Sequence, residues 1–319
     1  METPPLNTLL VGIQLPKVTD SDCESSLAEL GRLVHTLGYV VVGSLRQKRN
    51  STSNALVVGE GKLQEIAKWT GGTGVVAPTV TRKKSKAAER FDDEGIDDPP
   101  DTQPSEPPSE GVRAEVVIFD CDLTPSQLRN LESATGAIVL DRTGVIIEIF
   151  SRHARTRAAR LQVEIARLNY LAPRIREAGG GRDRQGGGIG GKGAGESSQE
   201  LDRRHIRDRI KELKDELASV QQESSLRRHR RGGENSVALV GYTNAGKSSL
   251  MRAMTGSEVL VADKLFATLD TTVRPMHPPS VPKVLLSDTV GFIKKLPHDL
   301  VASFRSTLEE ALNSDLLLI

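Results

Sequence analysis

Residues 241–248 read Gly241-Tyr242-Thr243-Asn244-Ala245-Gly246-Lys247-Ser248, which is a complete GxxxxGK[ST] pattern. The apolar residues 236–240 before it predict a buried strand, and residues 248–254 after it predict a helix that ends at Gly256. In such a strand, loop and helix, glycines bring backbone N–H groups onto phosphates, and the helix dipole favours negative charge. The stretch therefore predicts an α/β fold and a loop that binds a nucleoside polyphosphate.

Two side chains of this loop have specific expected roles. The Lys247 ammonium would reach the β and γ phosphates, and the Ser248 hydroxyl would ligate Mg²⁺. The alternative interpretation is a Gly-rich turn before a helix. It accounts for less of the pattern, because the flanking strand and helix are both indicated as well.

A second motif follows the apolar residues 284–287. Asp288-Thr289-Val290-Gly291 is a DxxG sequence in which Asp288 can hold Mg²⁺ through water and the Gly291 N–H can meet a γ-phosphate. By itself DxxG usually marks a turn. Here the Thr-rich residues 266–272 lie between the two motifs, and a threonine hydroxyl that joins the Mg²⁺ shell only with the γ-phosphate would act as a switch.

Composition sets the broad class of protein. The chain has 319 residues, a net charge of +1 and only 3% aromatic residues, which is typical of about two domains with aliphatic cores. The two cysteines, Cys23 and Cys121, are too few for a disulfide framework, and both are expected to be buried free thiols. The N-terminus lacks the features of a targeting segment, and no run is long enough to span a membrane, so a cytoplasmic protein is expected.

Residues 1–150 alternate strand-like and helix-like segments, which predicts a small α/β domain. Strands are expected near 9–13, 39–42, 116–119 and 137–140, and 74–77 is a further strand-like apolar run. Helices are expected at 62–69, from Thr124 onward, and after residues 20–22, where the first helix has Leu27, Leu30, Val34 and Leu37 on one face. Asp20 and Asp22 are candidate caps of the first helix, and residues 124–127 have capping-box spacing with proline at the first helical position. Residues 79–113 are rich in charge, Pro and Ser, which indicates a disordered insertion that splits this domain.

Residues 151–231 have a different pattern. Apolar residues recur at alternating steps of four and three on two segments, and the Gly-rich residues 179–195 lie between them, which predicts an antiparallel helical hairpin. Residues 152–231 hold 20 Arg and Lys against 11 Asp and Glu. Composition leaves two interpretations open, a solvated helical arm or an arm that contacts nucleic acid. Residues 235–319 form a third region, with a last helix expected at 300–312 and a last strand at 315–319.

Four segments together resemble the HflX-type GTPases, a family of ribosome-associated translational GTPases. They are GYTNAGKSSL (241–250), DKLFATLDTTVR (263–274), DTVGFIKKLPHDLVASFRSTLEE (288–310) and VLDRTGVIIEIFSRHARTRAARLQVEIARLNYL (139–171). The resemblance covers nearly the whole chain apart from the insertion. It implies an N-terminal α/β domain, a helical hairpin and a P-loop G domain that binds and hydrolyses GTP with Mg²⁺.

The resemblance also assigns residues and partners. Residues 241–248 are then the phosphate loop, Asp288 to Gly291 the second switch, and the first switch is the run Phe266, Ala267, Thr268, Leu269 and Asp270. Thr268 resembles the switch hydroxyl on Mg²⁺, with Thr272 as a substitute. The family implies binding to the large ribosomal subunit and its RNA and the separation of ribosomal subunits, notably under stress. We also expect a monomer. The Gly-rich loop resembles the family's loop up to Glu196, whereas residues 197–200 depart from it, so both a linker and an RNA-binding loop remain open.

Two positions bear on hydrolysis. Phe292 stands where Ras-like enzymes carry a water-orienting glutamine, and phenylalanine cannot make the needed hydrogen bond. We therefore expect slow intrinsic hydrolysis that a partner surface accelerates. Asn244 resembles the asparagine that binds potassium in some related GTPases, where K⁺ can replace an arginine finger.

The base-reading NKxD motif does not occur in these 319 residues. The sequence itself therefore leaves GTP and ATP open, and an RNA-dependent P-loop ATPase is an alternative. A second alternative is a ribosome-binding protein whose G domain does not hydrolyse nucleotide. The chain ends at Ile319 within an apolar run that should be a central strand, which would leave an unpaired apolar edge. We interpret it as a fragment of a longer protein, or else as a natural truncation with compromised nucleotide binding.

Overall fold

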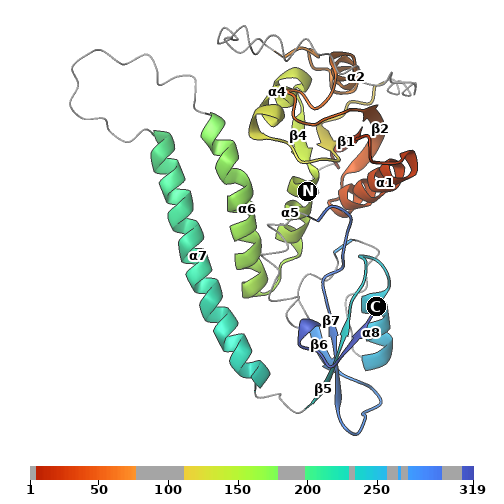
Figure 1. The fold of residues 1–319 in the computed structure, drawn as a ribbon, viewed down its shortest axis with the longest axis vertical. Coiled ribbons are helices and arrows are strands. Elements are labelled where there is room, and N and C mark those ends of the chain that lie inside the picture. Colours follow the sequence, from red (N-terminus) through yellow and green to blue (C-terminus); the bar gives the residue numbers. More distant parts are fainter. Residues whose placement is uncertain are drawn as a thin grey trace, which may run out of the picture. The chain divides into compact units, whose positions relative to one another are not determined.

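The computed structural model describes residues 5–76, 111–178, 198–229, 234–256, 265–266, 272–296 and 311–319. The chain divides into two compact units, Met1–Val145 and Ile146–Ile319. Each unit contains a four-stranded sheet with helices, so the α/β fold class predicted from the sequence is confirmed (Figure 1). The division into three domains, with boundaries at residues 150 and 231, stays a prediction.

The N-terminal unit is built on a parallel sheet in the order β2-β1-β3-β4. Its strands are β1 (Asn7–Gln14), β2 (Val40–Lys48), β3 (Val116–Phe119) and β4 (Ile138–Asp141). Every residue of β3 is buried, as expected for a strand covered on both faces. Because β3 pairs with β1, segments on both sides of residues 77–110 belong to one sheet. The predicted insertion lies almost wholly outside the described residues.

The helices of this unit are α1 (Asp20–Thr36), α2 (Glu60–Thr70) and α4 (Pro125–Thr135). The capping box of α4 is confirmed, because Thr124 accepts from Gln127 N and the Gln127 side chain bonds back to Thr124 N. The predicted caps of α1 were wrong. Thr19 is the N-cap and accepts from Asp22 N, because the capping residue is the last one before the helical turn.

The apolar run 74–77 does not form a strand where it is described. Residues 74 and 75 lie in a bend. Gly74 has φ of +67°, which is outside the range of a strand, and its N–H donates to Ala134 O at the end of α4. Both cysteines are free thiols as expected, although Cys121 is only partly buried.

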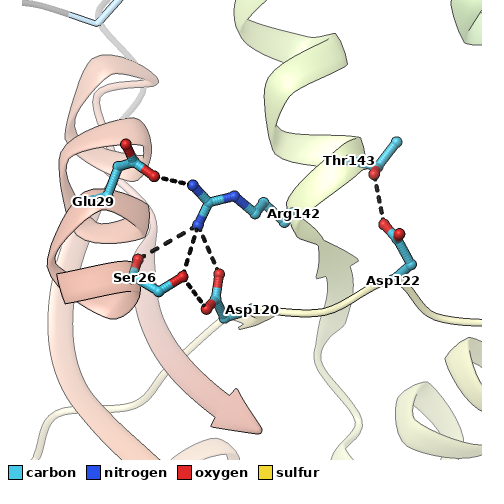
Figure 2. A network of polar contacts seen from close by, with 6 residues as sticks. All are labelled: Ser26, Glu29, Asp120, Asp122, Arg142 and Thr143. Atoms are coloured by element: carbon cyan, nitrogen blue, oxygen red, sulfur yellow. Dashed lines mark hydrogen bonds and ion pairs between the residues drawn. The ribbon is translucent and has the colours of Figure 1, made fainter. Parts of the chain in front are cut away.

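A helix that was not predicted, α5 (Arg142–His153), follows β4 directly. Its first residue carries a guanidinium that is 2% exposed and pairs with two carboxylates, those of Asp120 at 2.7 Å and Glu29 (Figure 2). The Ser26 hydroxyl completes the network by donating to Asp120 Oδ2 at 2.6 Å. The cluster ties the start of α5 to α1 and to the end of β3, and each of its buried charged groups has a partner of opposite charge from this chain.

The hairpin helices are α6 (Arg157–Ala178) and α7 (Ser198–His229). They lie side by side and antiparallel (Figure 1). The predicted apolar seam is confirmed, with Leu161, Ile165 and Leu213 buried at its centre. Arg157 at the start of α6 pairs with Glu216 in the second half of α7 at 2.7 Å, which agrees with the antiparallel order. The Gly-rich residues 179–195 lie outside the described residues.

The second sheet has the order β6-β7-β5-β8, with β6 antiparallel to β7 and the other pairs parallel. Its elements are β5 (Asn235–Leu239), α8 (Lys247–Thr255), β6 (Thr272–Pro275), β7 (Val284–Asp288) and β8 (Leu316–Leu318). The Asp315 carboxylate accepts from the Ser236 amide at 2.7 Å and its hydroxyl at 2.9 Å, which fixes β8 beside β5. Of the helix predicted at 300–312, only its last two residues are described, and they are helical. In the part of the chain that the structure describes, none of the helices has both the length and the apolar character of a membrane span.

Candidate nucleotide-binding site

The phosphate loop connects β5 to α8, as the sequence predicted. Asn244 and Gly246 adopt left-handed backbone angles, with φ of +59° and +93°, which turn the chain into the helix. Gly246 is the N-cap of α8 and offers no side-chain hydrogen bond to the first turn. Gly256 ends the helix in a left-handed conformation, and its N–H donates to Arg252 O. The N-terminus of α8 is therefore presented without a capping side chain.

Lys247 folds back over its own loop. Its ammonium donates to Tyr242 O at 2.7 Å and to Gly241 O at 3.2 Å. Burial lowers the pKa of the Lys247 ammonium, and the nearby Asp288 carboxylate opposes that shift. Carbonyl oxygens are neutral acceptors, so a phosphate would compete effectively for this cation. The contact of Lys247 with β and γ phosphates stays a prediction.

Ser248 and Asp288 are brought together from the two motifs. The Ser248 hydroxyl donates to Asp288 Oδ2 at 2.6 Å, and Asp288 is fully buried at the end of β7. A hydroxyl and a carboxylate supply the hard oxygen atoms that Mg²⁺ prefers, so the donor set fits this ion. Among the described residues there is no cluster of three His, Cys, Asp or Glu side chains that could hold a metal. The Ser248–Asp288 pair is the candidate metal position because it brings these two oxygen donors together.

The rest of the DxxG segment is anchored by its side chains. The Thr289 hydroxyl donates to Leu239 O at 2.7 Å, and Thr289 and Val290 are buried. Gly291 packs on the phosphate loop so closely that a Cβ atom there would lie 2.6 Å from Thr243 Cα and 2.7 Å from Thr243 N. Thr289 and Val290 thus have structural side chains, and Gly291 brings its backbone against the loop.

Phe292 continues this contact through its main chain. Its N–H donates to Gly241 O at 3.0 Å, and its carbonyl accepts from Thr243 N at 2.8 Å. Tyr242 and Phe292 form a parallel bridge beyond the ends of β5 and β7. Both residues are exposed, Tyr242 at 62% and Phe292 at 39%. Sequence reasoning predicted the loss of the glutamine side chain here, but it did not predict this backbone bridge.

The first switch is described at one of its five predicted residues. The Phe266 ring is 2% exposed and packs edge-on against Phe150, with ring centroids 4.7 Å apart and planes at 85°. Its side chain therefore contributes to packing. The apolar run 265–267 between Lys264 and Asp270 was a signal for such burial. The remaining predicted contacts, Ala267, Thr268, Leu269 and Asp270, lie outside the described residues.

A phosphate loop that packs on a DxxG segment, with its serine bonded to a buried aspartate, defines a P-loop nucleotide-binding protein of the GTPase type. Three family models match the chain: "GTP-binding GTPase N-terminal" at residues 24–81 and 108–151, "GTP-binding GTPase Middle Region" at 153–231, and "50S ribosome-binding GTPase" at 236–319.

Relatives over the whole chain identify the family. A protein of Gluconacetobacter diazotrophicus named GTPase HflX is 63% identical over 321 residues, which cover 100% of this chain and 70% of that protein. A GTPase HflX of Caldanaerobacter subterraneus subsp. tengcongensis is 42% identical, over 94% of this chain and 62% of that protein. The chain belongs to the HflX family of GTPases.

Two solved structures align with nearly the whole chain. A complex of SsGBP with GDP aligns at 25% identity and a TM-score of 0.49, over 98% of this chain and 72% of that chain. A GTP-binding protein of Sulfolobus solfataricus in complex with GDP aligns at 24% identity and a TM-score of 0.47, over 98% of this chain and 70% of that chain. With TM-scores below 0.5, the family assignment rests on the sequence relatives.

Proposed function

We propose that this chain binds GTP with Mg²⁺ at the phosphate loop and takes part in GTP hydrolysis. The observation that carries the proposal is the Ser248–Asp288 contact at 2.6 Å, because it joins the two motifs at the first turn of α8. When bound, Mg²⁺ would bridge phosphate oxygens and offset their charge. Ser248 would ligate it directly and Asp288 through water, while Lys247 would bind the β and γ phosphates.

The sequence contains no NKxD motif, which is the motif that would recognise guanine. The preference for guanine in this proposal is therefore supported by membership of the HflX family. The rival is an RNA-dependent P-loop ATPase. Competition of GTP, GDP and ATP for a fluorescent GTP analogue separates the two. We expect GTP and GDP to displace the analogue and ATP to fail at the same concentrations. Equal displacement by ATP would favour the rival.

Hydrolysis in the isolated protein is expected to be slow. Phe292 offers neither a donor nor an acceptor in its side chain to orient water, so catalysis must draw on the phosphate loop and on groups from a partner. Rapid turnover by the isolated protein would contradict this. Asn244, at its left-handed turn in the loop, is our candidate K⁺ ligand. Equal hydrolysis rates in sodium and potassium buffers would remove that assignment.

We further propose that the protein associates with the large ribosomal subunit and its RNA, and acts in separating ribosomal subunits under stress. The match of residues 236–319 to a model described as a 50S ribosome-binding GTPase supports this, as does the excess of Arg and Lys over residues 152–231. Contacts with phosphates predict that binding weakens steeply as salt rises, which sedimentation with purified subunits would measure. Salt-independent binding would contradict a contact with RNA.

A ribosome-binding protein without hydrolysis is the second candidate, and Lys247→Ala tests it. If nucleotide state controls attachment, the variant should lose nucleotide-dependent binding to the large subunit. Unchanged binding, in a protein whose parent form shows no hydrolysis, would favour the second candidate.

A monomeric state and a cytoplasmic location stay predictions. Size-exclusion chromatography with light scattering would test the monomeric state.

A further inference from the structure

The main-chain carbonyl of Gly241 is shared by two donors that come from the two nucleotide motifs. Lys247 Nζ donates to it at 3.2 Å, and Phe292 N donates to it at 3.0 Å. The Lys247 ammonium is the group that we expect to bind phosphate, and Phe292 is the residue directly after DxxG. One acceptor therefore connects the phosphate-binding lysine to the second switch.

The bridge at Phe292 lies beyond the regular pairing of β5 with β7. That pairing ends at Leu239 opposite Asp288, and the bridge joins Tyr242 to Phe292. The β7 side thus contains one residue more than the β5 side between these two points, and Gly291 lies within that longer side. The absence of a side chain on Gly291 allows the close approach, because a Cβ atom would overlap Thr243.

We propose that the main chain of Phe292 is a positioning element for the GTPase site. Through its two hydrogen bonds it holds Gly291 against Thr243, so that the Gly291 amide faces the position of the γ-phosphate. Through Gly241 O it is coupled to Lys247. This inference rests on the proposed function, because it assigns how GTP is distinguished from GDP at the same site.

The physical sequence of events follows from competition for acceptors. A bound β or γ phosphate draws the Lys247 ammonium away from Gly241 O, since a charged acceptor binds an ammonium more strongly than a carbonyl does. The Phe292 amide then has that carbonyl to itself, and the bridge strengthens. Only the γ-phosphate of GTP also offers an acceptor to the Gly291 amide, which is why the effect is larger with GTP than with GDP. The side chain of Phe292 has no part in either bond, which explains how a phenylalanine can occupy this position.

The test compares Phe292→Pro with Phe292→Ala in the full chain. Proline removes the N–H that donates to Gly241, whereas alanine removes the ring and keeps both backbone groups. The readout is the ratio of Kd for GDP to Kd for GTPγS, measured with Mg²⁺ by calorimetry. We expect the alanine ratio to match the parent and the proline ratio to fall roughly three- to tenfold, the size expected for one hydrogen bond.

Equal ratios in both variants, or weaker binding of GDP and GTPγS by the same factor in Phe292→Pro, would overturn the inference. A parent chain that binds neither nucleotide would instead overturn the proposed function, so the two failures are distinguishable.

A second measurement does not depend on how the proline variant folds. Amide hydrogen exchange in the parent chain should show slow exchange at Phe292 and Thr243, and GTPγS should slow Phe292 further than GDP does. Fast exchange at Phe292 with GTPγS bound would also overturn the inference.

Discussion

The two sheets of this protein each carry a buried aspartate where a strand ends, but the surroundings of these aspartates differ. Asp120 follows β3 and is paired with the Arg142 guanidinium at 2.7 Å, beside Ser26. Asp288 ends β7 and accepts from the neutral Ser248 hydroxyl at 2.6 Å. The carboxyl ends of strands are where α/β sheets bind ligands, so both positions have the geometry of a site.

The difference lies in which partners the chain itself supplies. In the N-terminal unit, Arg142 supplies a cation that two carboxylates share, so the cluster is saturated from within. In the second unit, Asp288 faces a hydroxyl, and Lys247 is held by carbonyls that a phosphate can replace. At the carboxyl end of a strand, an aspartate that is paired with a cation of the same chain contributes to stability. An aspartate whose neighbours can exchange their partners is suited to binding a ligand.

Removing the cation from the closed cluster should have the largest effect. Arg142→Met keeps an unbranched side chain but leaves Asp120 and Glu29 buried without their cation, which should lower the free energy of unfolding by about 3–5 kcal/mol. Trp69 is the one tryptophan of the chain and is buried in this unit, so its fluorescence in a urea titration reports the loss.

The matched control is Arg46→Met, because Arg46 pairs with Glu24 at the surface, where the Glu24 side chain is 63% exposed. We expect a loss below about 1 kcal/mol there. Similar losses in the two variants would mean that the buried cluster has no special role in stability. Nucleotide affinity should be unchanged in Arg142→Met under conditions where it is folded.

Neutralising the aspartate of the second sheet should affect ligand binding more than folding. Asp288→Asn keeps an oxygen that can accept from Ser248 but removes the charge that favours a cation. We expect the tightening of GTPγS binding by Mg²⁺ to fall by about 10- to 100-fold, which corresponds to about 1.4–2.7 kcal/mol.

Asp315→Asn is the control for this change, because the exposed Asp315 carboxylate binds Ser236 at the edge of the same sheet. Backbone and side-chain hydrogen bonds from Ser236 lower the pKa of Asp315, so a small loss of stability is expected, with Mg²⁺ dependence intact. An undiminished Mg²⁺ effect in Asp288→Asn would exclude Asp288 from the metal site.

Features that depend on neighbouring residues were predictable from the sequence. The phosphate loop, the capping box of α4 and the seam of α6 and α7 are each specified within a few turns of chain. Helix α5 was missed for a physical reason: apart from Glu148, its residues Val145 to Phe150 are apolar and β-branched in part, which also fits a buried strand. One polar residue in so short a run does not reveal a helical period.

Contacts between distant segments could not be predicted in the same way. The packing of Phe266 on Phe150 and the bridge from Phe292 to the phosphate loop join residues far apart in the chain. The contact between Ser248 and Asp288 was an exception, because both of their motifs were expected to hold the same Mg²⁺ ion. Sequence therefore indicated which residues meet at the site, but not which backbone groups hold them there.

The smallest expected effect concerns the helix N-termini of the two units. Helix α4 is capped by the Thr124 side chain, whereas α8 begins at Gly246 without a side-chain cap. Thr124→Ala should lower the free energy of unfolding of the N-terminal unit by about 1 kcal/mol, followed by Trp69 fluorescence. Ser133→Ala, at an exposed position of the same helix, is the control and should stay within about 0.5 kcal/mol of the parent. If Thr124→Ala matches that control, the cap adds nothing to stability. The difference between the capped N-terminus of α4 and the uncapped N-terminus of α8 would then have no measurable effect on the stability of α4.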